Sequence, residues 1–557
     1  MLFVASHSPG RLFWTRGGSD VSGGGGYSRY LEHLIKTRYI TNLGDWGKKE
    51  SPLSAQSFDT RGSCLVAGVN SWKMAGTKKP RSTSPSRSPK PRSTAPSRSP
   101  VRQRVSEANP KKMAASATQA ASAEAGKEPL EFGGWPGAIG LIVFSHFIVY
   151  YTFTALEEKK GALFWDMSLM LKTIVTKAAP TVESVTIYGA FILLEAILAA
   201  VLPGFKTQGL PIPHLKNKSL AYNCNAYFAW WVTLAVIGTL HFTGTLRLGR
   251  IATLRGPLLT CAVLFSDALS VCVYVAAFAT KTTHRMSGNH LYDFFMGASL
   301  NPRIGSLDIK MWAEVRVSWI TLFLLTLSEA AKQVEDTGKL GWPLAFMVLA
   351  HWLYANACCK GEELIVPTWD IFYEKYGWML CYWNLCGVPF MYSFNSAFLN
   401  HHAGPVGTPN ILVVALFVAL LCAYYVFDTA NAQKNIYRQQ LRGAYQKRPW
   451  YIFPQFSYMS CGPNPKHIKT KAGSPLLVDG WYKYARKVHY TADASMAMMW
   501  GLSCGMSHFL PYFYFVFFSS MITHRALRDN EKCARKYGDD WVEYCRQVPY
   551  VLIPGVW

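Results

Sequence analysis

The sequence predicts an all-α polytopic membrane protein, with roughly eight to ten transmembrane helices behind a disordered basic N-terminal arm. Two observations carry this prediction. Half of the 557 residues are hydrophobic, yet the formal net charge is +24, and the two properties occupy different parts of the chain. Residues 1–112 hold about 20 Lys and Arg against 6 Asp and Glu, roughly +14 of the total. The apolar residues gather behind this arm, in stretches of about 20, the length that a helix needs to cross a bilayer.

Nine apolar stretches follow one another along the body of the chain. They are 136–156, 184–204, 224–245, 256–280, 311–331, 343–359, 378–399, 410–428 and 494–521. The last is the longest, and it fits either one span with a re-entrant piece or two short spans. A single stretch of this kind is compatible with a buried helix of a soluble protein. So many in succession exclude an ordinary soluble domain.

The N-terminal arm, residues 1–130, has a composition typical of disorder. Residues 81–100 read RSTSPSRSPKPRSTAPSRSP, which is rich in Ser, Pro and positive charge and has no apolar periodicity. Such a segment buries too little surface to offset its chain entropy. It is either a solvated tail or a phosphorylatable segment that touches anionic lipid or nucleic acid. Translation from Met74 or Met113 is a further alternative, in which the upstream residues are a gene-model extension.

Several common sites are missing from the sequence. The 13 cysteines show no CxxC spacing, so neither a disulfide framework nor a zinc site is indicated. No GxGxxG follows a predicted strand, which argues against a Rossmann domain, and there is no GxSxG, HExxH or P-loop. The adjacent His401 and His402 point in different directions on most backbones. We interpret them as part of a surface loop rather than as metal ligands, and we expect no metal.

Polar and aromatic residues gather between and after the spans, at 288–305, 356–379, 476–493 and 521–550. The last cluster places basic residues beside aromatic ones at helical spacing. Its members are Arg525, Arg528, Lys532, Arg535, Lys536 and Arg546, with Tyr537, Trp541, Tyr544 and Tyr550. Such a surface could hold a phosphorylated aromatic ligand. The other interpretation is the positive-inside rule, under which Lys and Arg flank a cytoplasmic helix end. Spacing alone leaves both open.

Two long motifs resemble the signatures of the sterol reductase family. GNHLYDFFMGASLNPR, residues 288–303, is similar to the first, and MITHRALRDNEKCARKYG, residues 521–538, is similar to the second. The family includes sterol C-14 reductases, 7-dehydrocholesterol reductase, lamin B receptor and the fungal C-24(28) reductases. The resemblance covers about 131–557, which it identifies as a membrane sterol reductase domain.

Two further segments indicate the branch of the family. CCKGEELIVPTWDIFYEKYGWML (358–380) and GWYKYARKVHYTAD (480–493) are most similar to the C-24(28) reductases. The implied activity is NADPH-dependent reduction of a sterol double bond, the C-24(28) bond in the last step of ergosterol-type synthesis. The implied location is the endoplasmic reticulum membrane. Alternatives are a C-14 or C-7 reductase, and, in another class, a lamin-B-receptor-like anchor whose arm binds nucleic acid. A transporter would show internally repeated span pairs, and none is visible.

The resemblance also implies a cofactor site, because in this family residues equivalent to 430–557 build most of an NADPH pocket. Carried over by motif, its members are Lys434, Arg438, Leu477, Tyr482, His489, Tyr490, Arg525, Asp529, Cys533, Ala534, Arg535, Lys536, Tyr537 and Tyr544. Tyr482 stands where several relatives have Trp, and His489 stands where they have Asn. Stacking survives the first change, whereas a hydrogen bond through His489 depends on its tautomer.

The implied chemistry also needs an acid, because an isolated alkene accepts hydride only after it is protonated. Ionisable residues in or beside spans are costly and therefore natural candidates. We expect Glu363 and Asp370 to serve. Glu314, Glu362 and Glu374 also qualify, as do the tyrosines Tyr373, Tyr392 and Tyr490. The alternative for any of the carboxylates is an ion pair with Arg316, Lys360 or Lys375 that only holds helices together. Arg303 is expected to pair with Asp308.

Overall fold

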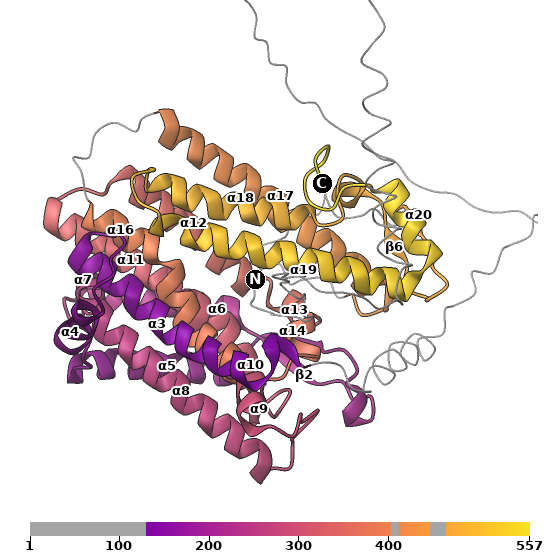
Figure 1. The fold of residues 1–557 in the computed structure, drawn as a ribbon, viewed down its shortest axis with the longest axis horizontal. Coiled ribbons are helices and arrows are strands. Elements are labelled where there is room, and N and C mark those ends of the chain that lie inside the picture. The colour runs from indigo at the N-terminus through magenta and orange to yellow at the C-terminus, as the bar shows by residue number, and fades with distance from the viewer. Residues whose placement is uncertain (1–129, 403–410, 446–463) are drawn as a thin grey trace, which may run out of the picture. The chain divides into compact units, whose positions relative to one another are not determined.

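The computed structural model describes residues 130–402, 411–445 and 464–557. The predicted disordered arm therefore lies outside the described residues, except for Leu130. Helices make up most of the described chain, as Figure 1 shows, and the prediction of a helical polytopic protein is confirmed. The strands form three two-stranded antiparallel ribbons: β1 (Phe205–Gln208) with β2 (Ala221–Cys224), β3 (Arg303–Ile304) with β4 (Leu307–Asp308), and β5 (His467–Ile468) with β6 (Leu476–Leu477).

Among the described residues, five helices are long and apolar enough to cross a membrane. They are α3 (Trp135–Lys159), α5 (Val182–Val201), α8 (Arg255–Ala279), the continuous helix Ile309–Thr337 and α17 (Ile411–Leu441). The most apolar window of Ile309–Thr337 is 94% buried, whereas those of α5 and α17 are only 22% buried. The first therefore lies in the protein interior. The other two present apolar surface of the kind that faces lipid.

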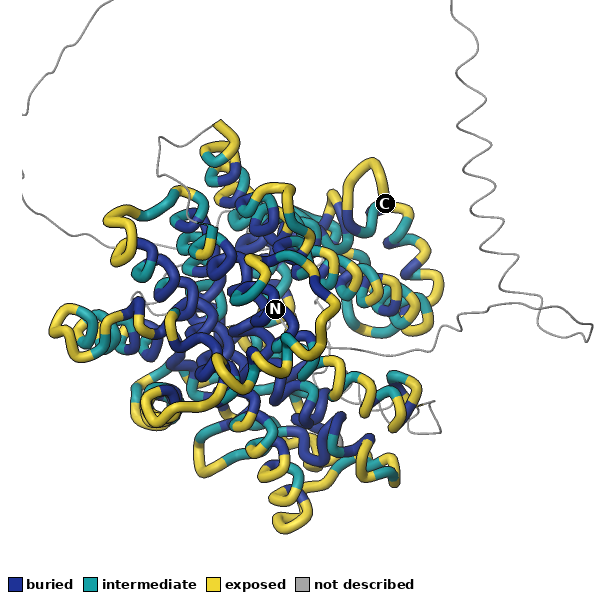
Figure 2. Tube along the Cα trace, turned by 60° about the vertical axis from the view of Figure 1, so that its left-hand side comes forward, coloured by how far each residue is buried: buried dark blue, intermediate teal, exposed yellow. Residues whose placement is uncertain are grey.

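The helix Ile309–Thr337 is built from three pieces: α10 (Ile309–Met311), the π-helical segment η3 (Trp312–Val317) and α11 (Ser318–Thr337). A second π-helical segment, η4 (Trp383–Met391), follows α15 (Trp378–Tyr382) and contains Pro389. The two π segments contact each other, and all their residues are buried. Figure 2 shows such buried segments in the interior and exposed residues at turns and helix ends. Because π-helical turns are rare and occur often at functional sites, this region is a candidate for ligand binding.

The other four predicted stretches form shorter or interrupted helices. These are α6 (Ala226–Phe242); α12 (Trp342–Lys360); α15, η4 and α16 (Phe394–His401); and α18 (Val488–Ser503), η7 (Leu510–Tyr512) and α19 (Phe513–Tyr537). Pro511 lies in η7, at the break between α18 and α19, where a proline favours the start of a new helix. That these four stretches span the membrane stays a prediction.

Short elements connect and cover these helices. They are η1 (Glu131–Gly133), α4 (Met167–Lys177), η2 (Pro213–Leu215), α7 (Leu248–Thr253), α9 (His290–Met296), α13 (Glu362–Ile365), α14 (Trp369–Phe372), η6 (Gly480–Lys483) and α20 (Asp539–Gln547). Side chains fix several helix starts. Asp166 accepts hydrogen bonds from the first turn of α4, and Thr181 and Ser184 form a reciprocal capping box at α5.

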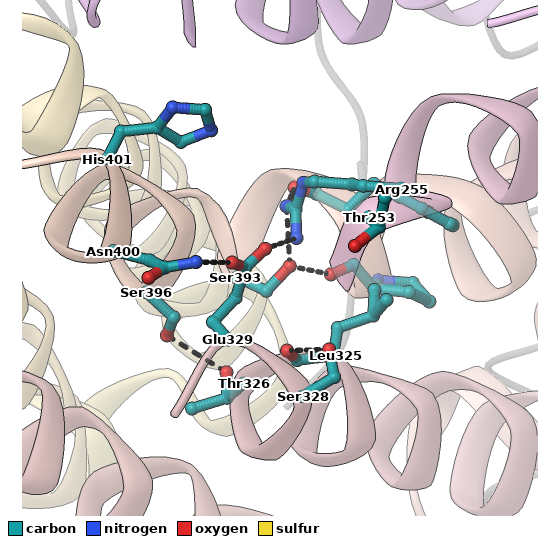
Figure 3. Close-up of polar contacts among 12 residues, drawn as sticks. Thr253, Arg255, Leu325, Thr326, Ser328, Glu329, Ser393, Ser396, Asn400 and His401 are labelled. Atoms are coloured by element: carbon teal, nitrogen blue, oxygen red, sulfur yellow. Dashed lines mark hydrogen bonds and ion pairs between the residues drawn. The ribbon is translucent and has the colours of Figure 1, made fainter. Parts of the chain in front are cut away.

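A buried ion-pair network, the Arg255–Glu329 cluster, ties α8, α11, η4 and α16 together (Figure 3). The Arg255 guanidinium lies 3.3 Å from Glu329 Oε1 and donates to the Phe390 carbonyl and the Ser393 hydroxyl. Asn400 donates to the other oxygen, Glu329 Oε2, at 2.8 Å. Both charged side chains are thus satisfied, as buried charges must be.

His401 closes α16 and His402 caps it, so the interpretation of these two residues as part of a surface loop is wrong. The His402 ring stacks on Phe398 at 4.0 Å between ring centroids, and His401 lies 3.7 Å from Glu157 Oε1. Packing of one ring on an apolar residue of the preceding turn extends the helix to this point. The described residues contain no group of three or more His, Cys, Asp or Glu that could hold a metal ion.

Candidate functional site

The residues assigned to the cofactor site come together at the C-terminal elements. In Figure 1, α18 and α19 run alongside each other, and β6 and α20 lie near one end of α19. Leu476, Tyr537, Trp541, Tyr544 and Val548 pack into one apolar cluster that joins β6, α19 and α20. This cluster holds the basic end of α19 in place beside the start of α18.

The centre of the site is an ion pair between Lys487, directly before α18, and Asp529 on α19. Burial opposes ionisation of Asp529, but Lys487 and Lys434 outweigh it and hold the pKa of Asp529 below its usual range. Burial likewise opposes the charge of Lys487, and Asp529 outweighs it and raises the pKa of Lys487. Both groups are therefore charged at neutral pH. Arg438 and Cys533 are further neighbours of Lys434.

A second group of predicted residues forms an aromatic wall at the start of α18. The Tyr482 hydroxyl donates to the Ala430 carbonyl at 3.2 Å and lies 3.4 Å from His489 Nδ1. The rings of His489 and Tyr490 are 4.5 Å apart, and Leu477 packs with Tyr482 and Tyr437. Burial and the nearby lysines hold the pKa of His489 well below its usual range. The imidazole is therefore neutral, with one nitrogen that donates and one that accepts.

Arg525 connects the cofactor residues to the candidate acids. Its charged and titratable neighbours are Tyr490, Asp370, Asp529 and Glu374. Two other predicted members lie apart from the site's centre: Arg535 and Lys536 are exposed, and the Lys536 ammonium lies 5.0 Å from the Tyr537 ring centroid. Ala534 and Cys533 pack at the edge of the apolar cluster that contains Tyr544. The structure thus assembles most, but not all, of the predicted set.

Two contributors were missing from the prediction. The first is Lys487, whose sequence signal was its place in the basic Arg486-Lys487 pair, one residue before His489 and Tyr490. The second is the C-terminal tail: backbone groups of Arg486 and Lys487 donate to the carbonyls of Tyr550 and Val551 at 3.0 and 2.8 Å. The tail therefore holds the basic pair in position, which no local pattern in the sequence indicates.

The two predicted acids, Glu363 and Asp370, are both buried, on the short helices α13 and α14. Asp370 Oδ1 has no hydrogen-bond partner among the described residues. Burial raises the pKa of Asp370 to about 6, although Arg525 opposes the shift. Asp370 is thus mostly ionised at pH 7, and only a minor fraction of it carries the proton that a general acid donates.

The remaining acid candidates divide into paired and unpaired groups. Glu362 forms an ion pair with Arg316 at 2.8 Å and accepts from the Ala226 amide, so it has the helix-holding role expected as the alternative. Glu374 accepts from the Trp369 indole at 2.6 Å. Glu314, on η3, is fully buried, and neither carboxylate oxygen has a hydrogen-bond partner among the described residues.

Of the three cations proposed as alternative partners, Arg316 pairs with the candidate Glu362, and the other two lie beside other carboxylates. Lys360 pairs with Asp428 at 2.9 Å, and Lys375 lies 3.8 Å from Asp293. The predicted pair of Arg303 and Asp308 is present, with 3.0 Å between Nε and Oδ2. Of the tyrosines, Tyr373 stacks on Trp369 at 3.8 Å, and the Tyr392 hydroxyl accepts from the Trp383 indole at 3.0 Å.

The comparisons with known proteins agree on one family. The ergosterol biosynthesis ERG4/ERG24 family matches residues 127–557. A Delta(24(24(1)))-sterol reductase of Aspergillus fumigatus is 43% identical over 445 residues, which cover 78% of this chain and 94% of the relative. A Delta(24(24(1)))-sterol reductase of Gibberella zeae is 41% identical, over 77% of this chain and 73% of the relative. A Delta(14)-sterol reductase of Dictyostelium discoideum is 33% identical, over 76% and 92%.

Proposed function

The chain belongs to the ergosterol biosynthesis ERG4/ERG24 family, and from that premise we propose that it reduces the C-24(28) double bond of a sterol with NADPH. The observation that carries the proposal is the gradient of identity. The chain is 41–43% identical to two fungal Delta(24(24(1)))-sterol reductases, against 33% for a Delta(14)-sterol reductase of similar coverage. The endoplasmic reticulum membrane is the proposed location, since it is general for this family.

The residues at the C-terminal site suit NADPH in charge and in the aromatic rings that they offer. Arg438 and Lys487 supply the positive charge that phosphates require, Lys434 lies beside them, and Asp529 fixes the position of Lys487. The rings of Tyr482 and Tyr490 offer flat surfaces for an aromatic base. The neutral His489 ring supplies one donor and one acceptor nitrogen at the same place.

When bound, the cofactor supplies hydride, while the protein controls orientation, water and protons. Protonation of the terminal CH₂ of a C-24(28) methylene leaves a tertiary cation at C-24, and hydride then quenches that cation. The side chains must therefore place an acid beside the alkene and keep water away from the cation. The tightly packed aromatic residues of α12, α18 and α19, among them Tyr354, Trp500 and Tyr514, suit the second task.

The proposal is tested by expressing the full chain in a yeast strain that lacks its own C-24(28) reductase and profiling the sterols by mass spectrometry. We expect the 24(28)-unsaturated sterol to disappear with the intact protein and to persist with Asp529→Ala. Asp336→Ala is the matched control, because Asp336 also pairs with a lysine but lies at an exposed helix end. An intact, expressed protein that leaves this sterol untouched contradicts the C-24(28) assignment.

The same experiment separates the alternatives. Complementation of a C-14 reductase mutant instead would support that regiochemistry, to which the Dictyostelium relative points. A second candidate is a membrane anchor, favoured by one comparison: chicken Delta(14)-sterol reductase LBR is 32% identical over 76% of this chain. Its test is binding of nucleic acid by the full chain with a steep dependence on salt concentration.

A further inference from the structure

Helix α18 carries an acidic residue next to the cofactor site that the proposed mechanism has not used. His489 and Tyr490 lie in its first turn. Asp493 lies four residues after His489 and three after Tyr490. With 3.6 residues per turn, Asp493 lies on the same face of the helix, one turn further along. The residues assigned to the cofactor and this carboxyl therefore face the same side of α18.

Asp493 is buried in a way that does not serve stability. Only 2% of the residue is exposed, Oδ1 accepts a long hydrogen bond of 3.4 Å from the Tyr354 hydroxyl, and Oδ2 has no partner among the described residues. None of the ion pairs in the described part of the chain involves it. Burial raises the pKa of Asp493 to about 7, so the carboxyl carries a proton for much of the time at neutral pH.

Among the described residues, the titratable groups that face Asp493 are weak acids rather than cations. They are Tyr354 and Cys358 from α12, Tyr392 from the end of η4 and Tyr514 from α19. His351, on α12, lies in the same region, with its ring 4.6 Å from that of Trp500. The buried His351 Nε2 and Trp500 Nε1 also lack partners among the described residues. Such a concentration of unsatisfied polar atoms in a core indicates a ligand site.

The walls around the carboxyl are aromatic. Measured between ring centroids, Trp500 stacks on Tyr514 at 4.9 Å, and Tyr514 lies 4.2 Å from Tyr392. The Tyr354 ring lies 6.0 Å from that of Phe427. Aromatic faces attract positive charge through the ring quadrupole and also exclude water. A carbocation that forms beside Asp493 would therefore meet the environment that stabilises it.

From this geometry we propose that Asp493 is the acid that protonates the sterol alkene, and that Tyr354 is a positioning residue that orients its carboxyl. The proposal rests on the reductase function proposed above. The proton of the carboxyl passes to the terminal CH₂, the alkene π electrons form the new C–H bond, and C-24 becomes the cation. Bound NADPH would supply the hydride, with its electron pair, that C-24 then needs, and the products would be the saturated sterol and NADP⁺. The Asp493 carboxylate then takes a proton from solvent.

Other buried carboxyls fit this role less well, because cations accompany two of them and the third lies on another helix. Glu362 is paired with Arg316, and Asp370 is a neighbour of Arg525. Glu314 has no hydrogen-bond partner among the described residues, but it lies on η3, whereas Asp493 shares α18 with His489 and Tyr490 of the cofactor site. A cation stabilises the carboxylate and lowers its pKa, so a smaller fraction of the carboxyl carries the proton that the reaction needs at neutral pH.

The test compares variants of the full chain in membranes, with kcat and the dissociation constant of NADPH as separate readouts. We expect Asp493→Asn to lower kcat by about 10²- to 10⁴-fold, the usual contribution of a general acid, while NADPH affinity stays within about twofold. Asp493→Glu should restore part of the activity. The matched control is Glu195→Gln. Glu195, on α5, is a fully buried carboxyl that accepts from the Thr233 hydroxyl, and its other oxygen has no partner among the described residues.

The pH profile examines Tyr354 separately. The acid form of Asp493 is lost as pH rises through about 7, so kcat should fall above that pH. The Tyr354 hydroxyl bond stabilises the carboxylate, so Tyr354→Phe should move this fall to higher pH. A purely structural role would leave the profile in place.

The outcomes distinguish the two proposals. An inactive wild-type protein that binds no NADPH overturns the proposed function itself. An active wild type with an Asp493→Asn variant that keeps kcat within about fivefold overturns only the assignment of the acid. If Asp493→Asn fails to fold, the Tyr354→Phe profile decides: a shift to higher pH supports the assignment, and an unchanged profile overturns it.

Discussion

Glu329 on α11 and Asp493 on α18 are buried to nearly the same extent, 3% and 2% exposed, but they are surrounded by opposite chemistry. Both oxygens of Glu329 are satisfied, one by Arg255 and the other by Asn400 (Figure 3). Asp493 has one long hydrogen bond from Tyr354 and one oxygen without a partner among the described residues.

The difference separates a carboxylate that joins helices from a carboxyl suited to exchanging a proton. The ion pair with Arg255 makes Glu329 part of the contact between α8, α11 and α16. Burial without a cation favours the neutral form of Asp493, and a neutral acid can give up a proton. Burial alone therefore does not reveal a function, whereas the partners of the buried group do.

The largest effect should come from removing one partner of the satisfied pair. Arg255→Met leaves the Glu329 carboxylate buried without its cation, and we expect the free energy of unfolding to fall by about 3–5 kcal/mol. Denaturant unfolding of the solubilised protein measures this. The double variant Arg255→Met with Glu329→Leu should recover much of the loss, because it removes the orphan charge as well. If the free energy of unfolding of Arg255→Met stayed within about 1 kcal/mol of the wild-type value, the ion pair of Glu329 would not have the structural role that distinguishes it from Asp493.

The next effect concerns Asp493, whose replacement should raise the free energy of unfolding rather than lower it. Its folded pKa of about 7 lies above the usual value of about 3.9, so its stabilising contribution is complete at low pH and is lost as pH rises through 7. Asp493→Asn has no such proton to lose. Between pH 5 and 7 the variant should therefore gain about 2–3 kcal/mol relative to the wild type. Parallel stability curves for the two proteins across this range would contradict the assigned environment.

The third prediction concerns the ion pair of Lys487 and Asp529, which lies at a partly open site. Their side chains are 13% and 43% exposed. Lys487→Met should weaken NADPH binding by about 10- to 100-fold, through loss of a charge-assisted contact. Titration of the purified protein with NADPH measures this. Lys483→Met is the matched control, since Lys483 is a nearby lysine that lies over the Tyr484 ring. Equal loss in both variants would mean that only overall charge matters.

The spans were predictable from sequence because their signal is local. Helices α3 and α8 begin and end within about three residues of the predicted stretches 136–156 and 256–280, since a run of apolar side chains sets the length. The π segments were not predictable. Pro389 marks an interruption in the stretch 378–399, but it does not specify a π-helical turn.

The candidate site likewise has contacts that the sequence predicts and contacts that it does not. Arg525 and Asp529 share one helix, so their spacing alone places them together. The contact of Lys487 with Asp529 joins residues 42 positions apart, and that of Tyr354 with Asp493 joins residues 139 apart. Tertiary packing of α12 against α18 creates the second contact, and no local periodicity encodes it. The acids predicted from sequence, Glu363 and Asp370, were chosen for their type and place, without knowledge of their partners.

The smallest effect should come from an ion pair at the surface. Lys332 and Asp336 on α11 pair at 2.8 Å with helical spacing, and their side chains are 32% and 54% exposed. Lys332→Met should lower the free energy of unfolding by only about 0.3–0.5 kcal/mol, because water already solvates both charges. The same denaturant experiment, repeated in high salt, should reduce the difference further. A loss as large as that of Arg255→Met would mean that pairing itself, rather than burial of the pair, produces the stability of the Arg255–Glu329 cluster.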